Sequence, residues 1–374
     1  MCESIRGFVP NFFLNILLTG VRNQQENNTF IMSEYGQFII LVGDLIPSPT
    51  TLYQVEKYLG SGTYGVVIQC RNVTTNETVA LKIIKGRGNF ECARAELGIH
   101  QTMQELHSDR FNIVRLNESF TYKAHCCLVF EHLDMDLNTF MQINPGQQLQ
   151  LMQIRPILQQ LAASLVFLKS AGIIHTDLKP DNIMIVDHVR QPLKVKVIDF
   201  GLAFDYPEQQ GGLTLQTLWY RSPEILAGFA FNGAIDIWSL GCIAAQLFMG
   251  TPLFPAYNET DLWNQIVYTV GKQLFAQHYF WPKCWMEWRF LTSFHRLNGV
   301  DDYAEWVDLA WFIDLLEKML TFNPVERITP RGILEHPFIT MSHLEGPLKN
   351  CLYVIYSMDA MSSCQDTRSN DGVD

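Results

Sequence analysis

Apolar residues recur with two different periods along this chain of 374 residues, and the change of period organises the sequence. A segment that begins at Tyr53 alternates apolar and polar residues, and a glycine-rich turn and the β-rich run Val66–Cys70 follow it. Thr78–Ile84 and Cys127–Leu133 are short runs of similar character. Runs of this length that are rich in β-branched residues predict strands. Strands are therefore expected in the first third of the chain.

A helical period appears at Phe90–Leu106 and again after residue 150. Residues three or four apart form one apolar stripe in each segment, which predicts amphipathic helices. The stripes consist of Leu97, His100, Met103 and Leu106 in the first segment and of Ile157, Leu161, Leu165 and Leu168 in the second. Gly172 is placed to end the second helix as a left-handed cap. Asp236–Met249 is apolar on nearly all sides and ends at Gly250, so we expect a helix buried at the centre of its domain.

A β-hairpin is predicted between these helices. Ile183–Val186 and Val195–Ile198 are Val- and Ile-rich runs, joined by a polar turn at Asp187–Pro192. Such a hairpin would hold Asn182 at its entrance and Asp199 at its exit, side by side.

Four polar groups within this region suit phosphoryl transfer. That reaction needs a positioned hydroxyl, bound Mg²⁺ and compensating positive charge. Asp177 can accept the hydroxyl proton, Lys179 can neutralise the moving phosphate, and Asn182 with Asp199 offers hard oxygen ligands for Mg²⁺. A single Asp in a loop is more often a solvated surface group, but the joint order and spacing of these four favours the catalytic interpretation.

The glycine-rich turn supplies a second, weaker signal. Gly60, Gly62 and Gly65 let the backbone approach phosphates closely. A lone G-x-G-x-x-G also marks dinucleotide sites, but a strand follows here where those sites require a helix. No G-x-x-x-x-G-K-[ST] is present, so a P-loop NTPase has no support.

The amino-acid composition further restricts the class of protein. The formal charge of −11 and the absence of a Lys/Arg cluster argue against direct, sequence-independent nucleic-acid binding, and 48% hydrophobic residues allow two or three packed units. The nine cysteines form no C-x-x-C pair, which indicates reduced thiols and an intracellular protein. The apolar segment Asn11–Leu18 is too short to span a bilayer and lacks an evident cleavage site. We expect a docked or disordered extension there, with Met32 as a possible working start, and no membrane attachment.

Several motifs resemble those of known enzymes. H-x-D-x-K-P-x-N followed by D-F-G is similar to the catalytic and magnesium loops of protein kinases. W-Y-R-S-P-E resembles the group that contains the cyclin-dependent, mitogen-activated and dual-specificity tyrosine-regulated kinases. I-R-P-I-L-Q-Q, D-L-K-P-D-N-I-M-I-V-D and A-I-D-I-W-S-L-G-C are similar to the homeodomain-interacting protein kinases. The resemblance covers roughly Tyr53 to Phe338.

The resemblance implies an α+β, bilobal fold with a small antiparallel-sheet lobe that carries one main helix and a larger, mostly helical lobe. The implied segments are an N-terminal extension over 1–50, the small lobe and hinge over 51–133, the large lobe over 134–340, and a short polar tail over 341–374. It also implies that Thr217 hydrogen-bonds near Asp177 and Lys179, and that Glu224 pairs with Arg327.

An ATP site is implied as well. Lys82 would contact the phosphates and pair with Glu96, for which Glu91 and Glu105 remain alternatives. Backbone groups of Glu131–Leu133 would bind the adenine, with Phe130 behind them. The full set of implied nucleotide-binding residues is Leu59, Gly60, Ser61, Gly62, Thr63, Tyr64, Gly65, Val67, Ala80, Lys82, Glu96, Phe130, Glu131 and Leu133.

The family phosphorylates Ser and Thr, often before Pro, with ATP and Mg²⁺, and acts on proteins, transcription regulators among them, in the nucleus and cytoplasm. The oligomeric state is left open. Two departures are notable: Thr176 stands where most kinases have Arg, and Thr214 stands where the family autophosphorylates Tyr. We therefore expect weak dependence on activation-loop phosphorylation. The alternative is a pseudokinase that serves as a scaffold, although Lys82 and Asp177, whose loss marks many pseudokinases, are both kept.

Overall fold

The computed structural model describes residues 31–32, 39–61, 65–84, 90–144, 146, 148–205, 211–270 and 299–364. The chain divides into two compact units. The first unit comprises residues 1–87 and 120–129, and the second comprises residues 88–119 and 130–374. The apolar segment Asn11–Leu18 and the glycine-loop residues Gly62–Tyr64 lie outside the described residues.

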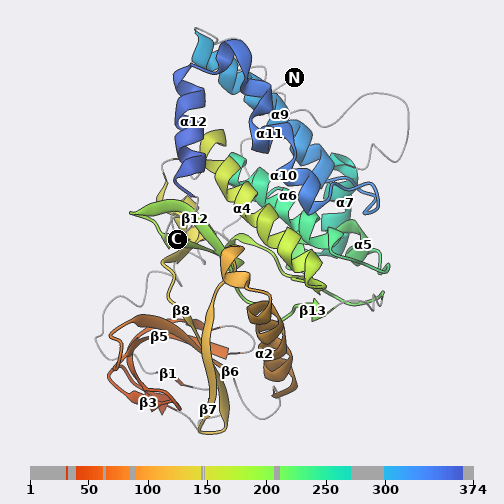
Figure 1. The fold of residues 1–374 in the computed structure, drawn as a ribbon. Coiled ribbons are helices and arrows are strands. Elements are labelled where there is room, and N and C mark those ends of the chain that lie inside the picture. Colours follow the sequence, from red (N-terminus) through yellow and green to blue (C-terminus); the bar gives the residue numbers. More distant parts are fainter. Residues whose placement is uncertain are drawn as a thin grey trace, which may run out of the picture. The chain divides into compact units, whose positions relative to one another are not determined.

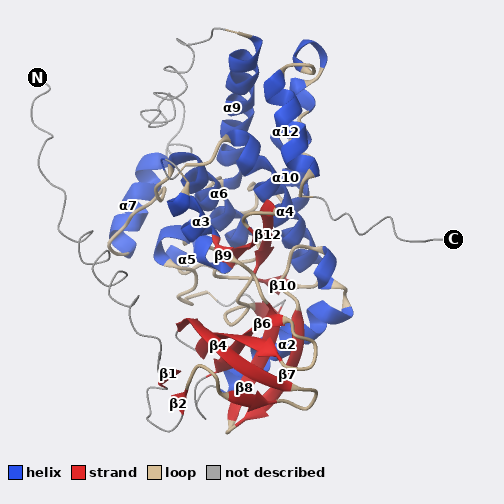
Figure 2. Cartoon of the chain, turned by 90° about the vertical axis from the view of Figure 1, so that its left-hand side faces the viewer, coloured by secondary structure: helices blue, strands red, loops and turns tan. Residues whose placement is uncertain are grey.

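A six-stranded sheet dominates the first unit, and it appears red in Figure 2. Its strand order is β3-β4-β5-β6-β8-β7, and β3 to β6 pair antiparallel. The bounds are β3 (Leu45–Pro47), β4 (Leu52–Ser61), β5 (Gly65–Asn72), β6 (Thr78–Ile84), β7 (Leu116–Tyr122) and β8 (His125–Glu131). A separate pair is formed by β1 (Ile31–Met32) and β2 (Ile39–Ile40). The sheet therefore begins at Leu45, within the stretch that the sequence assigned to an extension.

The alternation of side chains along β6 places Lys82 on the face of the sheet opposite the core. Val79, Leu81 and Ile83 are buried in the core of the first unit, whereas Ala80 and Lys82 are half-buried on the opposite face. A lysine within an apolar strand most often sits at an edge, but β6 is a central strand. Lys82 is thus held on a paired, rigid strand.

The second unit is mostly helical (Figure 1). Its helices are α2 (Phe90–Glu105), α3 (Leu137–Ile143), α4 (Leu151–Ser170), α5 (Pro223–Leu226), α6 (Ala234–Met249), α7 (Glu259–Thr269), α9 (Val300–Met319), α10 (Pro330–Leu334), α11 (Pro337–Thr340) and α12 (Leu352–Ser362). Its short strands are β9 (Met135–Asp136), β10 (Ile173–Ile174), β11 (Ile183–Asp187), β12 (Gln191–Val197) and β13 (Phe204–Asp205).

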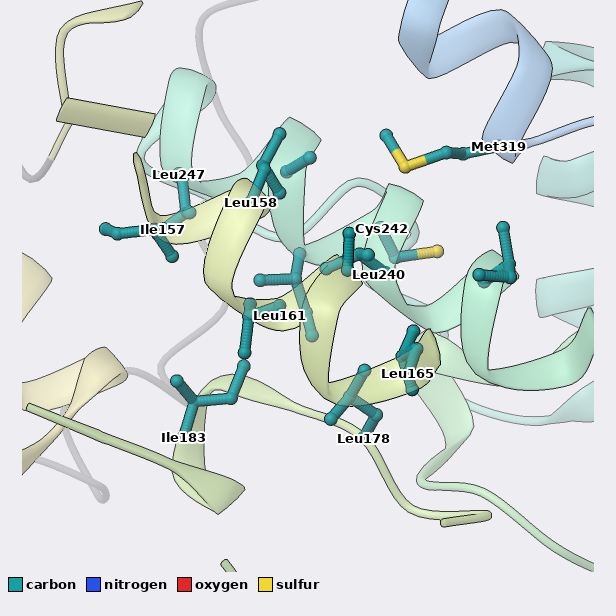
Figure 3. Packing of buried hydrophobic residues seen from close by; sticks show 14 of the residues in the cluster. Ile157, Leu158, Leu161, Leu165, Leu178, Ile183, Leu240, Cys242, Leu247 and Met319 are labelled. Atoms are coloured by element: carbon teal, nitrogen blue, oxygen red, sulfur yellow. The ribbon is translucent and has the colours of Figure 1, made fainter. Parts of the chain in front are cut away.

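Helices α4 and α6 form the centre of this unit, and the sequence predicted this position for α6. Figure 3 shows Leu161 and Leu165 of α4 packed near Leu240 and Cys242 of α6. Gly241 lets α9 approach, because a Cβ there would lie 2.9 Å from the Leu320 side chain. Among the described residues, α4 alone is long and apolar enough to cross a membrane, and most of it is buried in this core.

The predicted left-handed glycine at the end of α4 is confirmed, and the predicted end of α6 at Gly250 also has a left-handed conformation. Gly172 follows Ala171, the C-cap of α4, and has φ of 73°, and Gly250 directly follows α6 and has φ of 81°. These left-handed values favour glycine because it lacks a Cβ. The first of these caps turns the chain from α4 directly into the segment that contains Asp177.

Three details of the sequence interpretation are wrong. The hairpin turn is shorter than predicted, because Gln191 and Pro192 belong to β12, which pairs antiparallel with β11. The buried face of α2 does not include Leu106, which is exposed; Glu96 and His100 are buried on that helix. The chain after Phe338 is not merely a polar tail, because α12 packs on α4 and α9.

A buried polar cluster anchors α12. Tyr353 donates its hydroxyl hydrogen to Asp308 Oδ2 at 2.5 Å, and Arg155 Nη2 donates to the same oxygen. His343 Nε2 lies 2.8 Å from Asp308 Oδ1. All four side chains are almost wholly buried. Residues from α4, α9 and α12 therefore meet at one carboxylate.

Candidate active site

The loop that carries Asp177 is fixed by Asp236 of α6. The backbone N–H groups of His175 and Thr176 donate to the Asp236 carboxylate at 2.8 and 3.0 Å. Burial raises the pKa of Asp236, and this outweighs the opposing effects of His175 and the two N–H donors. Thr176 has φ of 67°, a left-handed conformation that is uncommon for a β-branched residue. Its hydroxyl donates to the Leu202 carbonyl at 2.6 Å, which ties this loop to the segment after Asp199.

Asp177 is the centre of the site. The backbone N–H and the hydroxyl of Thr217 donate to Asp177 Oδ1 at 3.0 and 2.7 Å. Lys179 Nζ donates to Asp177 Oδ2 at 2.7 Å and to Thr217 Oγ1 at 3.0 Å. Asn182 Nδ2 donates to the Asp177 carbonyl at 2.9 Å. The structure thus brings Thr217 to the catalytic-loop residues Asp177, Lys179 and Asn182, although Thr217 lies 40 positions after Asp177.

Asn182 and Asp199 lie at neighbouring ends of the β11–β12 hairpin. Ile198 N donates to the Asn182 carbonyl at 3.0 Å, so the two strands start and finish side by side. Asp199 follows β12, has φ of 60° and is exposed. An amide and a carboxylate are oxygen ligands suited to Mg²⁺, which commonly takes its remaining ligands from water and phosphates. No cluster of three or more His, Cys, Asp or Glu that could hold a metal occurs in the described ranges. A cation here would therefore need phosphate or water ligands, as a nucleotide-bound Mg²⁺ has.

A chain of aromatic rings links α2 to this loop. The ring of His100 lies 5.1 Å from that of Phe130 and 5.4 Å from that of Phe200, between centroids. The ring of His175 lies 5.0 Å from that of Phe200. Sequence reasoning placed Phe130 behind the nucleotide but assigned no role to His100 or Phe200. The order H-x-D and D-F-G was the signal that could have marked His175 and Phe200.

The predicted hinge is braced by a charged residue of the hairpin. Lys196 Nζ donates to Glu131 Oε1 at 2.5 Å, and Arg115 N donates to the same oxygen at 2.7 Å. Glu131 N donates to the Arg115 carbonyl at 3.1 Å. Leu133 is buried. The segment proposed to bind adenine is therefore held on two sides within the second unit.

Three of the predicted nucleotide-binding residues in the first unit lie on one face of the sheet: Val67, Ala80 and Lys82. Val67 and Lys82 are cross-strand partners in the β5–β6 register, and Ala80 lies two residues before Lys82 on the same face. Leu59 sits at an irregularity between Tyr58 and Gly60 and is exposed.

Gly65 has a packing reason to be glycine, because an added Cβ would lie 2.6 Å from the Ile83 carbonyl oxygen. Gly60 shows no such crowding, since a Cβ there would meet nothing within 4 Å. Gly62, Thr63 and Tyr64, also predicted to bind the nucleotide, are not among the described residues, whereas Ser61 ends β4.

Glu96 remains the best candidate to pair with Lys82. It is buried, at 3% exposure, whereas Glu91 and Glu105 on the same helix are exposed. Lys82 and Glu96 belong to different units, so the pair stays a prediction.

The segment after Thr214 is held by two arginines. Arg327 forms a bidentate pair with Glu224 at 2.7 and 2.9 Å, as predicted. Arg221 Nε and Nη2 donate to the Gln216 carbonyl at 3.2 and 2.9 Å, and Gln216 has φ of 64°. Sequence reasoning did not single out Gln216, because nothing in its local pattern shows that its carbonyl turns toward Arg221.

Six cysteines whose side chains the structure describes form no disulfide: Cys70, Cys126, Cys127, Cys242, Cys351 and Cys364. Burial raises the pKa of Cys70 and of Cys127 to about 12, so neither is a reactive thiolate at neutral pH.

Comparison with known proteins identifies the class. The protein kinase domain pattern matches residues 53–339, and the chain belongs to the protein kinase family. Among the proteins similar to it is homeodomain-interacting protein kinase 1 of Mus musculus, 38% identical over 83% of this chain and 29% of that protein. The protein of that name from Caenorhabditis elegans is 36% identical over 84% of this chain and 43% of that protein. The dual specificity protein kinase YAK1 homolog of Arabidopsis thaliana is 37% identical over 71% of this chain and 27% of that protein. The chain spans less than half the length of these three curated relatives.

Proposed function

We propose that this protein is an active, ATP-dependent protein serine/threonine kinase that uses Mg²⁺. The observation that carries the proposal is the arrangement around Asp177, where Thr217 and Lys179 fix both carboxylate oxygens. A carboxylate held by donors on both oxygens is preorganised to receive a proton from an incoming hydroxyl. A scaffold that only binds partners would not require this arrangement.

The remaining residues divide the work of phosphoryl transfer. ATP supplies the phosphoryl group when it is bound, and Asn182 and Asp199 would hold its Mg²⁺. Asp177 orients the acceptor hydroxyl and takes its proton. Lys179 lies between Asp177 and Thr217 and places positive charge where the phosphate arrives.

A preference for proline after the acceptor follows from Gln216. In an extended substrate segment, the residue that follows the acceptor normally needs a partner for its backbone N–H. The Gln216 carbonyl is a candidate acceptor because it directly precedes Thr217 of the site, but it already accepts two hydrogen bonds from Arg221. Proline has no N–H to satisfy, so it loses nothing at this position.

The names of the relatives suggest the biological setting. Relatives named for their interaction with homeodomains support transcription regulators among the protein substrates. We propose the nucleus and cytoplasm as the place of action. The net charge of −11 supports recognition of proteins without direct nucleic-acid binding. The Arabidopsis relative is named a dual specificity protein kinase, so tyrosine is a second acceptor to test.

The test is a radiolabelled phosphate-transfer assay with Mg-ATP and Ser-, Thr- and Tyr-containing peptides. Asp177→Asn and Lys82→Ala should each lower the rate by about 10²–10³, the typical loss when one preorganised stabilising group is removed. Equal signal from the wild type and both variants would overturn the proposal. ATP binding without labelled product would favour the scaffold instead. Phosphoamino-acid analysis of the products separates Ser and Thr from Tyr.

A further inference from the structure

Arg221 donates a third hydrogen bond, in addition to the two that it donates to the Gln216 carbonyl. Its Nη1 donates to Glu259 Oε1 at 2.6 Å, while Nε and Nη2 hold the Gln216 carbonyl. The Arg221 side chain is only 10% exposed, whereas that of Glu259 is 60% exposed. The nearly buried guanidinium thus donates hydrogen bonds to two partners, the Gln216 carbonyl of its own loop and the Glu259 carboxylate of α7.

The position of Glu259 is set by the start of a helix. It is the first residue of α7, and Asn258 caps that helix by accepting a hydrogen bond from Asp261 N at 2.9 Å. A negative charge in the first turn of a helix is stabilised by the helix dipole. The cap sets where α7 begins, and so it sets where the Glu259 carboxylate meets Arg221.

The neighbouring segment offers no other anion for Arg221 among the described residues. Thr214 is exposed, and the Thr176 hydroxyl donates to the Leu202 carbonyl. Glu259 is therefore the acidic partner that Arg221 has in this structure.

We propose that Glu259 is a specificity-determining positioning residue. By holding Nη1 of Arg221, it keeps the other two donors on the Gln216 carbonyl and so keeps that carbonyl closed to a substrate N–H. The inference rests on the proposed function, because it names what sets the substrate preference of that same site. Glu259 touches neither substrate nor nucleotide; it acts through Arg221.

The planar guanidinium of Arg221 couples its contact with Glu259 to its contact with the Gln216 carbonyl. Arginine presents its donors in a rigid fork, so a partner on Nη1 fixes where Nε and Nη2 point. Without Glu259 the guanidinium can turn toward solvent, and the Gln216 carbonyl becomes available to an N–H of a substrate residue other than proline. Removal of Glu259 should therefore weaken the preference for proline after the acceptor, in addition to any loss of rate.

The experiment compares two peptides that differ only in Pro or Ala after the acceptor. For Glu259→Ala we expect the Pro-to-Ala ratio of kcat/KM to fall about tenfold, the scale of one charge-assisted hydrogen bond. Glu259→Gln should fall less, because its amide oxygen can still accept from Arg221. Arg221→Lys should lower the ratio as well, since lysine has no fork.

Glu335→Gln is the matched control. Glu335 also pairs with an arginine, Arg331, at 3.0 Å, and its side chain is 67% exposed, but it lies on another surface. Its variant should keep the wild-type ratio. A purely structural role of Glu259 would lower kcat/KM for both peptides equally and leave the ratio unchanged, and that result would overturn the inference.

Fluorescence anisotropy with the same two peptides measures the preference without phosphate transfer. If the wild type binds Pro better than Ala but transfers no phosphate, the proposed function fails while the role of Glu259 is still decided by the binding ratio. An unchanged binding ratio in Glu259→Ala, in a protein whose melting temperature matches the wild type, would contradict the role of Glu259 alone.

Discussion

Thr217 donates two hydrogen bonds to a single oxygen of Asp177, one from its backbone at 3.0 Å and one from its hydroxyl at 2.7 Å. The two residues lie 40 positions apart and reach the site on different loops. The proposed general base is therefore oriented by the same segment that would receive the substrate. A change in that segment changes the base directly.

Thr217→Ala should lower kcat by about 10²-fold, the typical cost of a catalytic group displaced by about 1 Å. The backbone N–H bond remains, but the hydroxyl between Asp177 and Lys179 is lost. Thr217→Ser keeps the hydroxyl and should retain most of the activity. Steady-state kinetics with a Ser-Pro peptide measure both. Equal loss in the Ser and Ala variants would show that the methyl group, and not the hydroxyl, is what matters.

Thr214→Ala should change activity by less than about twofold, as expected of an exposed residue away from special contacts. Thr214 is exposed, and the loop next to it is held by Arg221 and Glu259 without a phosphate. Phosphatase treatment of the wild-type protein should likewise have little effect. A large loss in either experiment would contradict the expectation of weak dependence on activation-loop phosphorylation.

Tyr353→Phe should lower the free energy of unfolding by about 1–3 kcal/mol, because a buried carboxylate loses one donor. Asp308 would keep Arg155 and His343 but not the hydroxyl bond of 2.5 Å. Tyr356→Phe on the same helix is the control, since Tyr356 is 56% exposed. Urea unfolding of the three proteins measures the difference. Equal midpoints would mean that α12 is not anchored at Asp308.

Acidification should destabilise the second unit in two steps around α9 and α11. Burial lowers the pKa of His336, whose Nδ1 accepts from Phe338 N while Nε2 faces Asp314. The unfolded chain therefore takes up the proton first, and stability falls as the pH drops below about 6.5.

Asp314 contributes the second step. Burial acts to raise the pKa of Asp314, but hydrogen bonds from Lys318 and His336 outweigh it and the pKa is lowered. This part of the stability is present above the ordinary carboxylate range and is lost below about pH 4. Melting temperatures between pH 8 and pH 5 test the first step. His336→Gln should flatten that slope, and an unchanged slope would assign it to other groups.

Local sequence determined much of the fold and most of the catalytic set. The sequence placed four catalytic candidates on two neighbouring loops: Asp177, Lys179, Asn182 and Asp199. A short hairpin holds its two ends side by side, so Asn182 at its entrance and Asp199 at its exit were expected to be neighbours. The left-handed turn at Gly172 could be predicted for a similar reason, since glycine is cheapest where φ is positive. The boundaries of β6 were predicted to the residue from its short run of β-branched and apolar residues.

Tertiary structure decided what depends on contacts between distant segments. The Gln216 carbonyl accepts hydrogen bonds from Arg221, and Arg221 also donates to Glu259 of α7, which lies 38 positions away in the sequence. The anchoring of α12 could not be predicted because Asp308 and Arg155, which meet Tyr353, lie far away in the sequence. Periodicity reports how a segment is buried, not which segment covers it. For that reason the reaction class could be predicted from the residues alone, whereas the groups that set substrate preference appear only when the chain is folded.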